Sequence, residues 1–76
     1  MSTGSIGRNA TRIWKVMNNG AVWSYEQIKH SVNLSDREIN AAIGWLARED
    51  TLEIIQDPAT LEETYRVRHF WDMAGI

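Results

Sequence analysis

Side chains able to bond to the edges of bases stand in the stretch "NLSDREINAAIGWLARED", residues 33–50. Arg37, Asn40 and Arg48 carry guanidinium and amide groups, which suit the hydrogen-bonding edges of guanine and adenine in the major groove of DNA. At helical spacing they project to one side, beside small residues that would allow a duplex to come close. The candidate nucleic-acid-binding residues are Ser35, Arg37, Asn40, Ala41, Gly44 and Arg48.

The charge balance supports a second interpretation of the same face, in which it is an ordinary solvated surface. Four acidic residues accompany the two arginines of this stretch, and the whole chain has a net charge of -2. Residues 1–34 carry four basic residues against one acid, whereas residues 35–76 carry four against nine. Because phosphate neutralisation needs clustered Lys and Arg, this balance argues against a domain devoted to non-specific nucleic-acid binding.

No pattern of a catalytic or metal site is present. The chain has no Cys, and its two histidines, His30 and His69, belong to different predicted elements. Glu26 and His30 stand four residues apart, but the second His of a zinc motif is missing. We find no Ser-His-Asp arrangement, phosphate-binding loop or calcium loop. The sequence therefore predicts a protein that is not an enzyme and that has neither a metal nor another cofactor.

Two helices joined by a short turn should position the candidate residues. Ser24 with Gln27, and Ser35 with Glu38, are capping boxes that predict helices over residues 25–32 and from Asp36 onward. A preceding amphipathic helix is expected over residues 6–19, with its apolar positions at helical spacing. The third helix should bury Ile39, Ala42, Ile43 and Leu46. This order is the helix-turn-helix unit.

After the third helix the apolar pattern changes to a period of two. Residues 51–56 and 64–70 are rich in β-branched and aromatic side chains, and the chain's only Pro lies between them. They should pair as an antiparallel hairpin, and "AVW" at 21–23 should add a short strand. In the register that we expect, Gln56 lies opposite Tyr65, Glu53 meets Arg68 and Ile55 meets Arg66, so that the core face holds Leu52, Ile54, Tyr65 and Val67.

The element order and three motifs resemble a small bacterial family of stand-alone winged helix-turn-helix proteins of unknown function. The motifs are "IGRNATRIWKVMNNG" at 6–20, "LSDREINAAIGWLARED" at 34–50 and the strand that follows, with "GWLARED" the most specific part. The resemblance implies an α+β fold of three helices plus a small antiparallel sheet with a β-hairpin wing. It also implies a kinship with transcription factors. The acidic loop that holds Asp57, Glu62 and Glu63 departs from a wing that touches phosphate.

Several side chains could instead contact a protein partner or a second copy of the chain. Trp45 lies at the flank of the buried stripe of the third helix, where it either covers the edge of the hairpin or anchors an interface. Trp14 and Trp23 should belong to the core. The basic row on the first helix could meet an acidic partner, and Ile55 has no assured place in the core. The candidate partner-binding residues are Trp45, Ile55, Arg8, Arg12 and Lys15.

These observations give one domain with two open functions. We expect a flexible N-terminus at 1–5, a winged helix-turn-helix domain at 6–70 and a C-terminal tail at 71–76, in which Trp71 either frays or packs under the sheet. No apolar run has the length of a signal peptide or a membrane span, so we expect a cytoplasmic protein without a membrane partner. We expect it to act as a transcription-related DNA-binding or regulatory module; the alternative is a winged helix used for protein interaction or dimerisation without DNA contact.

Overall fold

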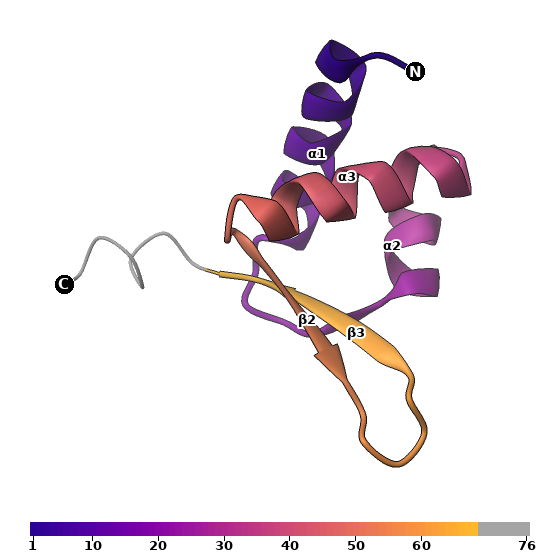
Figure 1. The fold of residues 1–76 in the computed structure, drawn as a ribbon, viewed down its shortest axis with the longest axis vertical. Coiled ribbons are helices and arrows are strands. Elements are labelled where there is room, and N and C mark those ends of the chain that lie inside the picture. The colour runs from indigo at the N-terminus through magenta and orange to yellow at the C-terminus, as the bar shows by residue number, and fades with distance from the viewer. Residues whose placement is uncertain (69–76) are drawn as a thin grey trace, which may run out of the picture.

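In the computed structural model three helices pack against a three-stranded antiparallel sheet, which confirms the α+β winged helix-turn-helix fold (Figure 1). The structure describes residues 1–68. The sheet order is β1-β3-β2, so the last strand lies in the middle. The elements in chain order are α1 (Thr3–Met17), β1 (Trp23–Ser24), α2 (Tyr25–Ser31), α3 (Asp36–Arg48), β2 (Leu52–Gln56) and β3 (Glu63–Val67).

Each helix begins at a serine that forms a capping box. Ser24 and Ser35 accept hydrogen bonds from the backbone N–H groups of Gln27 and Glu38, as the sequence predicts. A third box at Ser2 and Ser5 starts α1 at Thr3. The expectation that the first helix starts at Ile6 is therefore wrong: Ser5 occupies the capping-box position where Glu or Gln is usual, and residues 3–5 are helical.

The core lies where α1, α2 and α3 meet the base of the sheet. Its residues are Ala10, Ile13, Met17, Ile28, Val32, Ile39, Ala42, Ile43, Leu46, Leu52, Tyr65 and Val67. All four apolar positions predicted for the inner face of α3 are among them. Trp14 and Trp23 pack against this core but are only partly buried, which corrects the expectation that both are core residues.

The hairpin register differs from the predicted one by two residues, because the connecting loop is shorter than expected and β3 begins at Glu63. Gln56 lies opposite Glu63, Glu53 opposite Arg66 and Ile55 opposite Thr64. The loop over 57–62 is closed by hydrogen bonds in which the Asp57 N–H donates to the Glu62 carbonyl and the Leu61 N–H donates to the Asp57 carbonyl.

A shift of two residues keeps every side chain on its predicted face of the sheet. Leu52 and Val67 are accordingly buried, as expected. Ile54 shares their face and pairs with Tyr65, yet 47% of it is exposed. The expectation that it is a core residue is wrong, because the hairpin extends beyond the helices (Figure 1).

The short first strand is β1, at Trp23–Ser24 instead of 21–23. Trp23 pairs with Tyr65 and Ser24 with Thr64. The Asn19 side-chain oxygen accepts hydrogen bonds from the Ala21 N–H and from the indole N–H of Trp23, and it orders the connection from α1.

Within residues 1–68 no helix has both the length and the hydropathy needed to cross a membrane. The predicted behaviour of Trp71 falls outside the described residues.

Candidate nucleic-acid interface

The side of α3 opposite the core is open to solvent. Arg37, Asn40, Gly44 and Arg48 are exposed, and Ala41 is half-buried. A Cβ atom added at Gly44 would have no neighbour within 4 Å, so nothing in the described part of the chain covers the middle of this face. The structure thus brings five of the six candidate residues together. We call them the outer face of α3: Arg37, Asn40, Ala41, Gly44 and Arg48.

The sixth candidate, Ser35, is engaged in the start of the helix. Its hydroxyl oxygen accepts the Glu38 N–H at 3.2 Å, and its own N–H donates to the Glu38 carboxylate at 2.9 Å. The hydrogen bond from the Ser35 N–H to the carboxylate is the main cause that lowers the pKa of Glu38 below its ordinary value. Both groups therefore serve the cap, and the Glu38 charge is held close to the helix N-terminus, where the helix dipole favours a negative charge.

The other acid in the first turn of α3, Asp36, is bound to α2. Its carboxylate accepts a 2.6 Å hydrogen bond from the Tyr25 hydroxyl and lies 3.1 Å from the Lys29 ammonium. These two contacts lower the pKa of Asp36, the tyrosine bond more than the lysine. Burial and the neighbouring carboxylate raise the pKa of Tyr25 to about 12. This link between α2 and α3 holds the two helices of the helix-turn-helix together.

The two arginines of the outer face form no ion pair with another residue of the described part of the chain. Among residues 1–68, the ion pairs within 4.0 Å are Lys29–Asp36, Arg66–Glu53 and Arg68–Asp50. Arg37 and Arg48 take part in none of these pairs. The pairing of Arg48 with acids one turn away, a feature of the solvated-surface interpretation, is therefore absent from the described part of the chain.

The wing, residues 52–67, offers no comparable positive charge. Its two strands carry Arg66, which pairs with Glu53 across the hairpin. Arg68, just beyond the wing, pairs with Asp50 at 3.3 Å. At the tip, Asp57 accepts hydrogen bonds from the Ala59 and Thr60 N–H groups, which lower its pKa, while Glu62 and Glu63 are exposed.

The candidate partner-binding residues do not form one surface. Arg8, Arg12 and Lys15 are exposed along α1 on the side away from its buried residues. Ile55 is 38% exposed on the hairpin. Trp45 is 36% exposed and lies against α1, where its ring carbon would be 3.7 Å from a Cβ added at Gly7. It covers α1, so the expectation that it covers the hairpin edge is wrong.

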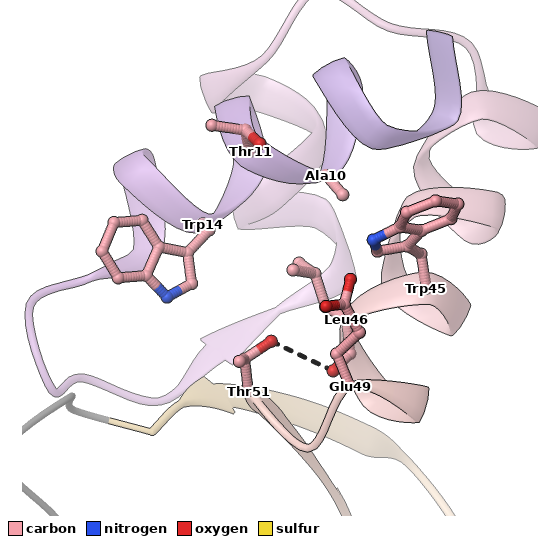
Figure 2. Close-up of a pocket in the computed structure, with 7 residues that line it drawn as sticks. All are labelled: Ala10, Thr11, Trp14, Trp45, Leu46, Glu49 and Thr51. Atoms are coloured by element: carbon pink, nitrogen blue, oxygen red, sulfur yellow. Dashed lines mark hydrogen bonds between the residues drawn. The ribbon is translucent and has the colours of Figure 1, made fainter. Parts of the chain in front are cut away.

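Two features of this region were not predicted from the sequence. One is the contact of Asp36 with Tyr25 and Lys29, which joins residues up to eleven positions apart. The other is a hollow between α1 and α3, whose side chains come from separate parts of the chain (Figure 2).

Among residues 1–68 no group of three His, Asp or Glu side chains is placed to hold a metal ion. His30 is exposed on α2, and His69 lies outside the described residues.

Comparison with known proteins agrees with this geometry. The search for similar curated proteins found no match. Residues 1–63 match the model of a family described as "Winged helix-turn-helix domain (DUF2582)". The match covers all three helices and ends at the first residue of β3. The chain therefore belongs to this family of winged helix-turn-helix domains.

Proposed function

We propose that the chain is a DNA-binding regulatory module that reads a duplex with the outer face of α3. The observation that carries the proposal is the pair Arg37 and Arg48. Both are exposed on one helix face, and neither enters an ion pair with another residue of 1–68. A guanidinium outside an ion pair has all five of its N–H donors available, and two of them can donate parallel hydrogen bonds to a guanine edge.

The surroundings of these arginines favour a groove contact. Asn40 lies one turn after Arg37 on the same face, and its amide can bond to an adenine edge. Gly44 leaves room for the backbone of α3 to approach the duplex. The acids of the first helical turn are held by Ser35, Tyr25 and Lys29, so their charges are partly balanced inside the protein.

The acidic wing indicates that contacts to bases should contribute more to DNA binding than contacts to phosphates. Phosphate contacts supply most non-specific affinity, and the wing is poor in cations to make them, since Arg66 on its strands pairs with Glu53. We therefore expect weak binding to arbitrary duplexes and a strong dependence on base contacts from α3. This behaviour separates the proposal from a general nucleic-acid-binding role.

The test starts with selection from a random duplex library at low salt. The affinity of an enriched duplex is then measured by fluorescence anisotropy for the wild type, Arg37→Ala and Arg48→Ala. Each lost base contact should weaken binding by about 1–3 kcal/mol, and the affinity should fall as salt rises. Arg12→Ala is the matched control, because it removes the same charge from the exposed row of α1, and it should change the affinity less than about threefold.

Two outcomes would reject the proposal. In one, the selection enriches no sequence. In the other, Arg12→Ala weakens binding as much as Arg37→Ala and Arg48→Ala do, which would indicate attraction by charge alone. Either result would favour the alternative function, a winged helix used for protein interaction without DNA contact.

A further inference from the structure

A hollow of about 200 Å³ lies between α1 and α3, and its lining includes none of the residues of the outer face of α3. Ala10 and Leu46 form its floor, and Trp14 and Trp45 form its walls. Figure 2 shows the two indole rings on either side of the hollow, with the side chain of Glu49 between them. Both tryptophans are only partly covered by the rest of the described chain. The hollow thus combines two aromatic walls with one carboxylate.

The Glu49 carboxylate has no partner in the described part of the chain. Glu49 is the C-cap of α3, and its backbone N–H bonds to the Trp45 carbonyl, but its side chain enters no hydrogen bond or ion pair within residues 1–68. The other polar side chain at this end, Thr51, uses its hydroxyl to bond to the Leu46 carbonyl at 3.1 Å. Glu49 therefore supplies the negative charge that a ligand would meet.

This combination is selective for one class of ligand. The face of an indole attracts cations more strongly than the face of any other aromatic side chain, and a nearby carboxylate adds direct charge attraction. An anion would be repelled by Glu49, and a neutral apolar group would leave the carboxylate without a partner. Pockets for whole small molecules usually have about 300–1,000 Å³, so a hollow of this size suits the head of one side chain.

We propose that this hollow binds the basic side chain of a partner polypeptide, with the Lys or Arg head between Trp14 and Trp45 and its charge against Glu49. The site goes beyond the DNA-binding proposal and uses none of the residues of the outer face. Because Arg37→Ala should leave the hollow intact, failure of one proposal does not decide the other.

The test follows the indole N–H signals in NMR spectra of the full chain, assigned from single Trp→Phe variants. The probe is a capped tripeptide with a central Arg, and the matched control has citrulline, the neutral isostere of Arg, at the same position. We expect the Arg peptide to shift the Trp14 and Trp45 signals at millimolar concentration. The citrulline peptide should need at least about tenfold higher concentration for the same shift, which corresponds to a difference in binding free energy of about 1.4 kcal/mol.

A second comparison tests the role of the carboxylate. Glu49→Gln keeps the size of the side chain and should weaken binding of the Arg peptide severalfold. Glu26→Gln, the same change at an exposed position of α2, should leave this binding unchanged. Choline is included as a small organic cation. The proposal is overturned if citrulline and Arg peptides bind equally, if Glu49→Gln has no effect, or if choline binds more tightly than the Arg peptide.

Discussion

The outer face of α3 and the wing are both open to solvent, but they present different charges. On α3 the acids of the first turn are engaged with Ser35, Tyr25 and Lys29, and two arginines remain without ion pairs within the described residues. On the wing the relation is reversed, because Arg66 is paired and Glu62 is exposed. The comparison shows that a count of charged residues does not describe a surface. The pairing of each charge decides what a partner meets.

The two regions also differ in how they contribute to stability. The inner face of α3 is buried along its whole length, whereas the hairpin is buried only at its base, at Leu52, Tyr65 and Val67. Beyond Leu52 the side chains of β2 become exposed. We therefore expect α3 to carry both the fold and the proposed binding, while substitutions toward the tip of the wing leave the fold unchanged.

The largest expected effect is the difference in stability loss between a substitution on the buried face of α3 and one on the wing. Ile43 is 5% exposed and Ile55 is 38% exposed. Ile43→Asp places a carboxylate without a partner in the core and should abolish cooperative unfolding at the wild-type temperature, since a buried unpaired charge costs more than a small domain can tolerate. Ile55→Asp should change the free energy of unfolding by less than about 1 kcal/mol. Thermal melts followed by circular dichroism measure both, and equal losses would contradict the comparison.

A smaller effect tests the charge of the wing. If the outer face of α3 binds DNA, removing the acid at Glu62 should reduce repulsion of the neighbouring phosphates. Glu62→Gln should therefore raise the affinity for an enriched duplex, and Glu62→Lys should raise it further, about severalfold at low salt. The gain should shrink at high salt, whereas melting temperatures should not change. Identical affinities for all three proteins would mean that the wing lies away from the bound duplex.

The smallest effect compares backbone conformations in the two regions. Gly44 lies inside α3 with free space around it, so Gly44→Ala should stabilise the fold by up to about 1 kcal/mol. Leu61 lies in the wing loop with a φ of 64°, a region that costs non-glycine residues roughly 1–2 kcal/mol. Leu61→Gly should therefore also stabilise, by about 0.5–1 kcal/mol after the loss of backbone entropy. Urea denaturation measures the free energy of unfolding of both variants. A loss of stability in Gly44→Ala would contradict the free space around Gly44, and a loss in Leu61→Gly would contradict the unfavourable backbone conformation of Leu61.

The helices could be predicted because their signals are local. Ser24 and Ser35 cap residues only three positions away, and the period of α3 alone separates Ile39, Ala42, Ile43 and Leu46 from the outer face. The start of α1 was missed because Ser5 is an unusual partner in a capping box. The hairpin register was missed for a related reason: it depends on the hydrogen bonds of the Asp57 loop, and the alternation of residues in a strand is equally compatible with a shift of two.

The sequence by itself determined the order of the elements, the inner face of α3 and the residues available on its outer face. Only the tertiary structure decided which charges remain free, because Asp36 and Asp50 find their partners eleven and eighteen positions away in Tyr25 and Arg68. It also decided the place of the hollow, since Trp14 and Trp45 come from different helices that meet only on folding. Periodicity describes one element at a time, whereas pairing and enclosure depend on how elements pack against one another.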